Sequence, residues 1–267
     1  MTMTMTMTNR PVALKMWMLC VPFVLLVAAK PYLRLHWMYL GHIGSLFLLA
    51  AFLMLPTSAA WDGRRVTMAL LITYLWHQFE EHGVDIYGNR YAFQTSANKL
   101  LGPILGCTPP GNSQCPLTVD AIFWANTLLV WWPNALALTF GVERRQLLVC
   151  AAGLTLANTV AHVMPAIVMR SYNPGLVSVL SLFVPLGIII LRNARRVWGA
   201  SHVAMALGFV WGALGHPFLL LAAYAIYWKE VSPTWVYPAV LFAYACLPFL
   251  VPQRLVVHIF DPPKRME

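Results

Sequence analysis

The chain has 267 residues, of which 60% are hydrophobic and only 10% are charged. Soluble domains carry about 25% charged residues, so this composition excludes a soluble or disordered protein and indicates a polytopic membrane protein. The formal net charge of +9 does not indicate nucleic-acid binding, because Lys and Arg are scattered between apolar segments. We expect membrane lipids as partners and no nucleic acid.

Apolar segments of the length of membrane helices follow one another along the chain. A spanning helix needs about 20 apolar residues, and continuous apolar runs argue against a membrane β-barrel. The expected spans are Leu14 to Ala29, Trp37 to Leu55, Val66 to His82, Leu117 to Gly141, Leu147 to Met169, Gly175 to Leu191, His202 to Trp228 and Trp235 to Val251. The predicted fold class is therefore all-α, a single transmembrane bundle of eight helices over residues 14–252. Residues 1–13 are expected to form a disordered tail, and residues 253–267 a cytoplasmic tail.

The distribution of basic residues predicts the orientation of the bundle. In the eight-helix arrangement twelve Lys and Arg fall on one side of the membrane and six on the other. Cytoplasmic loops carry the excess of positive charge, so both termini are expected in the cytoplasm. A cleaved signal peptide is the alternative for the first span, and it would leave the later helices in the same orientation. We expect the inner (plasma) membrane of a bacterium.

The longest polar segment, residues 82–116, falls on the exterior side in this orientation. It contains Cys107 and Cys115, separated by seven residues that include Pro109, Pro110 and Gly111. Two cysteines in an exterior loop rich in turn residues indicate a disulfide bond, with two free thiols as the alternative.

Carboxylates are absent from most apolar runs, and the end of the third span is the exception. A charge at mid-membrane costs about 2.5–3.5 kcal/mol, so the adjacent Glu80 and Glu81 require compensation there. At about 100° per residue, His77, Glu80 and Glu81 share an arc of about 100° on an α-helix, whereas His82 points elsewhere. The pattern thus predicts that one face of this helix presents an imidazole and two carboxylates to a common site. The alternative is a pair of solvated glutamates at the exterior interface.

A second polar group lies in the fifth span, where Asn158 and His162 are one helical turn apart. The third and fifth spans run in the same direction, so His77 and His162 both reach the exterior half of the bilayer at about 1.5 Å per residue. A hydrogen bond between helices would also explain this pair. The common depth favours one site, with Asn158 orienting the other residues or completing a coordination sphere.

These residues form three short motifs that resemble a known family. The motifs, in chain order, are His77-Gln-Phe-Glu80-Glu81, Asn158-Thr-Val-Ala-His162 and Tyr172-Asn-Pro174-Gly175. They are similar to the HXXEE, NXXXH and YXPG elements of the integral membrane proteins named for their HXXEE motif. The resemblance covers about residues 66–191. No reaction is assigned to that family, so the resemblance implies a site and not a function.

Three functions fit this set of residues. The first is an intramembrane metalloenzyme, in which His77, Glu80, Glu81, His162 and Asn158 hold Zn, Fe or Mn. The second is a metal-free acid/base isomerase or cyclase of an isoprenoid or sterol, because two carboxylates in one dry cavity cannot both ionise cheaply. The third is a transporter or membrane scaffold. Tyr172 would be available as a proton donor, and the depth of the site implies a lipophilic substrate.

Overall fold

The structure is a computed structural model that describes residues 26–55, 63–107, 114–140, 144–252, 256 and 260. Regular structure within these residues is helical, apart from an isolated bridge between Ala200 and Phe260. The predicted all-α class is therefore confirmed for the described part of the chain. The tail 1–13, the first span up to residue 25 and most of the tail 253–267 lie outside the described residues.

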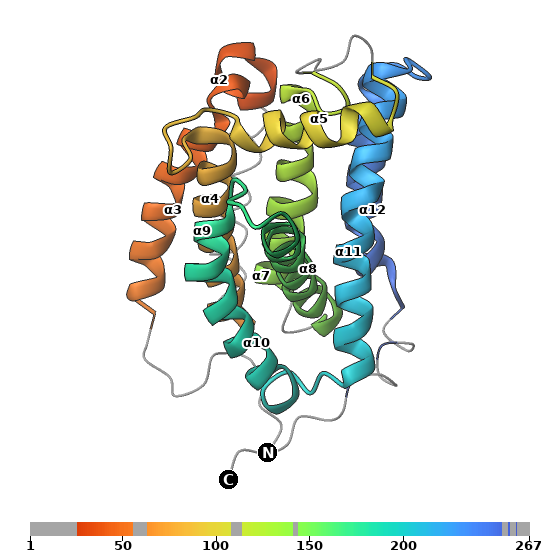
Figure 1. Cartoon of the computed structure of the whole chain (residues 1–267). Helices are drawn as coiled ribbons and strands as arrows, with labels where there is room; N and C mark the ends of the chain where they lie inside the picture. Colours follow the sequence, from red (N-terminus) through yellow and green to blue (C-terminus); the bar gives the residue numbers. More distant parts are fainter. Residues whose placement is uncertain are drawn as a thin grey trace, which may run out of the picture.

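Apart from α5, which lies across the upper part of the view, the long helices alternate in direction along the bundle (Figure 1). The first half comprises α2 (Pro31–Leu35), α3 (Trp37–Leu53), α4 (Gly63–Gln78), η2 (Phe79–Gly83), α5 (Ala92–Ile104), α6 (Val119–Ala125), η3 (Asn126–Trp131) and α7 (Trp132–Phe140). The second half comprises α8 (Arg145–Met169), α9 (Leu176–Ser178), η4 (Val179–Phe183), α10 (Val184–Arg196), α11 (His202–Ala223), η5 (Tyr224–Trp228) and α12 (Val236–Leu250). The η segments are π-helical turns that continue the preceding α-helix, so each such group forms one rod.

Four of these rods are long and apolar enough to cross a membrane, namely Val119–Phe140, Arg145–Met169, Leu176–Arg196 and His202–Trp228. The helices Trp37–Leu53 and Val236–Leu250 are also apolar but shorter. These helices therefore indicate a helical membrane protein, as the composition predicted.

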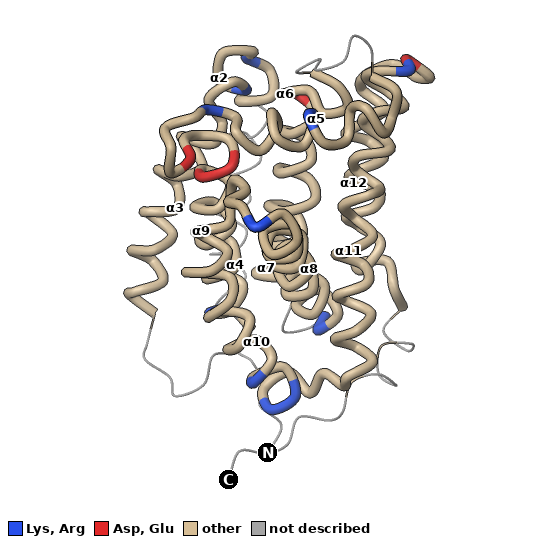
Figure 2. Tube along the Cα trace, in the orientation of Figure 1, with Lys and Arg blue, Asp and Glu red and all other residues tan. Residues whose placement is uncertain are grey.

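Charged residues are concentrated away from the middle of the bundle (Figure 2). Lys and Arg occur at both ends, whereas Asp and Glu of the described residues lie in the upper part of the view, where α2, α5 and α6 are found. We call this the upper end of the bundle. Most charged residues thus lie toward the ends of the bundle, as the low polarity of a bilayer core favours.

The central helix α8 packs closely against α11 through glycines. A Cβ placed on Gly153 would lie 2.2 Å from the carbonyl carbon of Gly208, and one on Gly212 would lie 2.6 Å from the Cα of Leu154. The two backbones therefore touch, which is the packing that small residues permit between membrane helices. This contact fixes the separation of α8 and α11 directly below the site.

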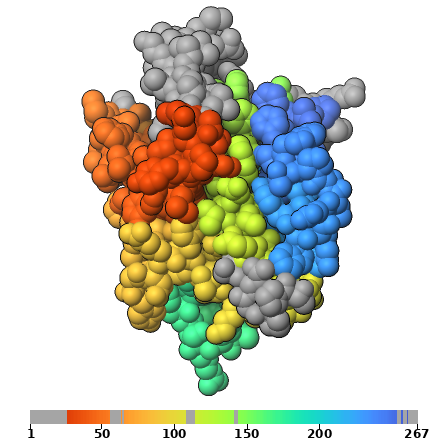
Figure 3. Space-filling model, turned by 90° about the horizontal axis from the view of Figure 1, so that it is seen from above, coloured from red at the N-terminus to blue at the C-terminus, as the bar shows by residue number. Residues whose placement is uncertain are grey.

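The upper end carries a helix that crosses the bundle, where the sequence predicted only a polar loop. Helix α5 lies across the ends of the other helices, and Figure 3 shows it from above beside α2 and α6. Gln94 and Asn98, one turn apart, both donate to the carbonyl oxygen of Leu117 at 2.8 Å. The predicted disulfide between Cys107 and Cys115 is confirmed and closes the connection between α5 and α6.

Candidate metal centre

The π-helical turn η2 directs the acidic residues at the end of α4. The amide N–H of Val84 donates to the carbonyl oxygen of Phe79, five residues earlier, at 3.0 Å. A π-turn is wider than an α-turn and shifts the side chains that follow it around the axis. Glu81 and His82 are consequently buried, whereas Glu80 is half-buried against a neighbouring loop. The spacing of 100° per residue used for the sequence does not hold across this turn.

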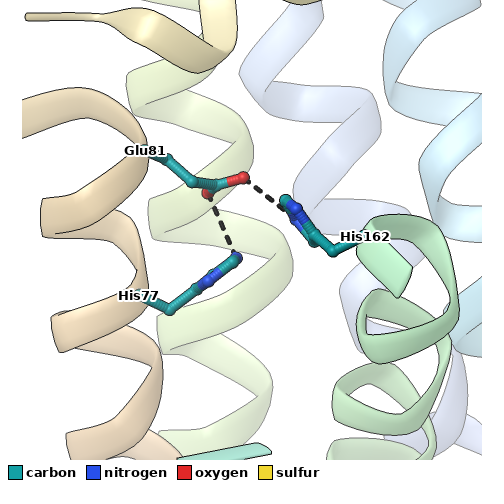
Figure 4. A group of neighbouring side chains, drawn as sticks. All are labelled: His77, Glu81 and His162. Atoms are coloured by element: carbon teal, nitrogen blue, oxygen red, sulfur yellow. Dashed lines mark ion pairs between the residues drawn. The ribbon is translucent and has the colours of Figure 1, made fainter. Parts of the chain in front are cut away.

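Three side chains from α4, η2 and α8 converge inside the bundle (Figure 4). One carboxylate oxygen of Glu81 lies 3.4 Å from Nε2 of His77, and the other lies 3.2 Å from Nε2 of His162. All three residues are buried, and one ligand atom from each lies within 4.8 Å of the others. The structure thus brings together His77, Glu81 and His162 as the sequence predicted.

The remaining nitrogen of each imidazole is held by a polar partner. Nδ1 of His77 lies 3.0 Å from the hydroxyl oxygen of Ser178, and Nδ1 of His162 lies 2.7 Å from Oδ1 of Asn173. The Asn173 amide is itself oriented, because its NH₂ donates to the carbonyl oxygen of His162 at 2.8 Å. The hydroxyl of Ser178 donates to Glu80 and therefore accepts from Nδ1 of His77. Both imidazoles thus carry their proton on Nδ1 and have a lone pair on Nε2, the nitrogen closest to Glu81. This orientation is the one that histidine ligands of metals adopt.

Glu80 binds the start of α9 and is linked to His77 through the hydroxyl of Ser178, which donates to the Glu80 carboxylate. Its carboxylate accepts hydrogen bonds from the hydroxyl of Tyr172 at 3.0 Å, from the amide of Val177 at 3.1 Å and from the amide of Ser178 at 2.7 Å. Burial, followed by the charge of Glu80, raises the pKa of the Tyr172 hydroxyl. The structure therefore places Glu80 and Tyr172 in a contact that fixes the loop between α8 and α9.

Gly175 brings this loop into direct contact with all three converging residues. Its φ of +93° is left-handed, and an added Cβ would lie 2.5 Å from Cε1 of His77, 2.9 Å from Cε1 of His162 and 3.0 Å from Cγ of Glu81. Only a residue without a side chain fits both the backbone conformation and the space. The glycine of the third motif thus has a packing role at the centre itself.

Asn158 and His82 complete the polar surroundings. Nδ2 of Asn158 lies 2.9 Å from Nε2 of His77, as a predicted member of the site. His82 is buried with Nε2 3.4 Å from Glu81, and the Asn126 amide lies 3.3 Å from the same nitrogen. The sequence reasoning placed His82 on another face because it assumed a regular α-helix. Its position directly after the motif is the one signal in the sequence for this role.

The second ring of partners, Ser178 and Asn173, was also absent from the sequence prediction. Asn173 lies inside the third motif and Ser178 follows it by one helical turn. Ser178 approaches His77 from a distant part of the chain, whereas Asn173 folds back onto His162 from the loop that follows the same helix.

A cavity of about 380 Å³ adjoins the centre. His77, Glu81 and Asn158 contribute to its wall, and most of the rest is apolar. The apolar lining comes from α5, α6, η3 and α11 and includes Phe93, Leu101, Ile122, Leu129, Trp211 and Leu220. Such a space suits an apolar molecule with a polar group at one side.

Fold and site together define a helical membrane protein with a buried histidine–glutamate centre beside an apolar cavity. Residues 68–190 match the profile of the family described as "Protein of unknown function with HXXEE motif". This match confirms the family resemblance of the motifs, and it covers the centre and the helices that carry it. Searches of curated proteins and of solved structures found no match.

Proposed function

We propose that the protein is an integral membrane enzyme that binds a divalent metal through His77, Glu81 and His162 and acts on a lipophilic substrate. The observation that carries this proposal is the convergence of two Nε2 lone pairs on one buried carboxylate. Three acceptors that face each other without a proton repel each other, and a cation between them removes that repulsion.

The donor atoms indicate which metals fit. Ligands bound to one metal at about 2.1 Å lie about 3.0–3.4 Å apart in tetrahedral or octahedral geometry. The separations of 3.4 Å from His77 to one Glu81 oxygen and 3.2 Å from His162 to the other fall within this range, and one ligand atom from each residue lies within 4.8 Å of the others. Two imidazoles and one carboxylate suit Zn, Fe or Mn. Such an ion would supply Lewis-acid or water-activating chemistry.

The adjoining cavity supports the class of substrate. Its largely apolar wall favours a lipid or isoprenoid, and His77, Glu81 and Asn158 would face the reacting group. We further propose eight spanning helices with both termini in the cytoplasm, which puts the upper end and the centre on the exterior (periplasmic) side of a bacterial inner membrane.

A metal-free acid/base isomerase or cyclase is the second proposal, and one contact favours it. The distance of 3.2 Å between Glu81 and Nε2 of His162 also permits a hydrogen bond from a protonated imidazole. In that case Glu81 and His162 would form a proton-transfer pair facing an isoprenoid-like substrate.

Metal analysis of detergent-purified protein distinguishes the two proposals. Wild type, His162→Ala and the control His202→Ala are purified without chelator and compared by inductively coupled plasma mass spectrometry. His202 lies at the opposite end of the bundle beside Arg195. We expect about one equivalent of Zn, Fe or Mn in wild type and His202→Ala, and loss in His162→Ala. Metal-free wild type, even after incubation with each ion, would refute the metalloenzyme and favour the acid/base reading.

A further inference from the structure

The side chain of Asn158 lies between two imidazoles from different helices. Its Nδ2 lies 2.9 Å from Nε2 of His77 on α4, and its Oδ1 lies 3.1 Å from Nε2 of His216 on α11. His216 and Asn158 both contribute to the wall of the cavity. The amide therefore connects α11 to the proposed metal centre.

The second ring nitrogen of His216 determines which proton it carries. Nδ1 of His216 lies 2.9 Å from the carbonyl oxygen of Gly212, and a carbonyl can only accept a hydrogen bond. Nδ1 therefore holds the proton, and Nε2 of the neutral ring presents a lone pair to Asn158. A lone pair pairs with an amide NH₂ and not with an amide oxygen.

Turning the Asn158 amide by 180° gives Nε2 of His216 a hydrogen-bond donor and exchanges the atom that faces His77. The NH₂ group then donates to Nε2 of His216, and Oδ1 takes its place 2.9 Å from Nε2 of His77. His77 directs a lone pair at this point as well, because its Nδ1 is paired with Ser178. Two acceptors at this distance are compatible when both bind one cation. In the other orientation of the Asn158 amide, its NH₂ group donates to Nε2 of His77 and occupies the lone pair that would bind the metal.

We propose that His216 is a positioning residue that turns the oxygen of Asn158 toward the metal, so that Asn158 becomes the fourth protein ligand beside His77, Glu81 and His162. This inference rests on the proposed metal site. It gives His216, which precedes Pro217 in the apolar helix α11, a role at the proposed centre. Residues that orient a metal ligand in this way typically change metal affinity by about 10–100-fold when they are removed.

The test measures Co²⁺ binding to metal-free, detergent-purified protein by titration and by the visible absorption of the bound ion, which reports the number and geometry of its ligands. His216→Leu should weaken Co²⁺ binding by about tenfold or more and alter the spectrum. His216→Gln should largely restore both, because its side-chain oxygen can accept from the Asn158 amide. His202→Leu, on the same helix and remote from the centre, should match wild type.

A second experiment, in the Asn158→Asp variant, distinguishes an effect of His216 on the orientation of residue 158 from an effect on packing. Asn158→Asp presents an oxygen whichever way the group is turned, so adding His216→Leu to it should weaken Co²⁺ binding by less than about twofold. Wild-type affinity and spectrum in His216→Leu would overturn the role of His216 while leaving the metal site intact. Equal losses in both backgrounds would show that His216 acts through packing alone. Absence of Co²⁺ binding by wild type would refute the metal site and this inference together.

Discussion

Glu80 and Glu81 are neighbours in the sequence, but their carboxylates have different surroundings. Glu81 lies beside the imidazole of His77 on its own helical rod and faces that of His162 on α8, whereas Glu80 accepts hydrogen bonds from the backbone N–H groups of Val177 and Ser178. A carboxylate that accepts hydrogen bonds from backbone N–H groups, such as that of Glu80, anchors a loop. A carboxylate that faces imidazole lone pairs, such as that of Glu81, requires a cation or a proton. The two positions therefore predict different consequences of the same substitution.

Glu81→Gln should abolish metal binding, leaving less than about one tenth of the wild-type content, because a neutral amide cannot replace a carboxylate ligand. Its expression and its thermal unfolding in detergent should stay close to those of the metal-free wild type. Metal content is measured by mass spectrometry and unfolding by differential scanning fluorimetry. Wild-type metal content in Glu81→Gln would refute the site.

Glu80→Gln should instead retain metal and lower stability. Whichever way the new amide is turned, its NH₂ group would face the backbone N–H of Val177 or of Ser178, and an unsatisfied polar group costs about 1–3 kcal/mol. The same two measurements apply to both variants. Loss of metal with unchanged unfolding in Glu80→Gln would show that Glu80, as the sequence predicted, belongs to the ligand set.

Gly175 allows a comparison between backbone strain and steric contact. Gly175→Ala and Gly88→Ala both place alanine at positive φ, which costs about 1–2 kcal/mol. An added Cβ on Gly88 meets no atom within 4 Å, whereas on Gly175 it meets His77, His162 and Glu81. We expect Gly175→Ala to lose metal and Gly88→Ala to keep it. Similar metal content in the two purified variants would contradict the assigned role of Gly175.

At the scale of single residues, the sequence predicted part of the site. His77, Glu81, His162 and Asn158 were expected at one site because two parallel helices bring equal depths together, and the structure places them in contact. The assignment of Glu80 to that group assumed regular helical geometry, which the π-turn alters. No local pattern in the sequence distinguishes a π-turn from an α-helix, so this difference could not be derived.

Among the helical elements, α5 and its connection to α6 differ most from the sequence prediction. Gly, Pro and polar residues in this region indicated a loop, yet Gln94 and Asn98 face inward and bind Leu117. The sequence predicted only an exterior polar loop here. The partner of both side chains is the backbone of Leu117, just before α6, which only the tertiary structure supplies.

The disulfide that closes this connection should be detectable by thiol labelling. A maleimide reagent applied without reductant should not modify Cys107 or Cys115, and it should modify both after reduction and unfolding. Replacing both by Ser should lower the free energy of unfolding by about 2–4 kcal/mol, because the unfolded chain gains freedom. Labelling of both cysteines in the untreated protein would contradict the bond.

For the whole molecule, the proposed orientation predicts opposite accessibility of the two ends. Glu230→Cys lies between η5 and α12 at the upper end, and Arg195→Cys lies at the other end of the bundle in α10. A membrane-impermeant maleimide should label Glu230→Cys in intact spheroplasts and Arg195→Cys only after permeabilisation. The reverse pattern would place the centre on the cytoplasmic side.

The overall class could be read from the sequence, whereas the interior packing could not. Apolar runs such as 145–169 and 202–228 exceed the bilayer thickness, and the structure has helices over both. Whether these two helices touch depends on Gly153 and Gly208 meeting at one level, and single glycines in apolar segments are too frequent to predict such a pairing.

The glycine contact between α8 and α11 also limits where the proposed lipophilic substrate could enter the cavity. Backbones that touch leave no lateral gate between these two helices, and they hold Asn158 and His216, a few residues further along, at a constant distance. A lipophilic substrate of the proposed kind would therefore have to enter between other helices of the bundle. The close backbone contact also opposes the relative rocking of α8 and α11 that alternating access would require.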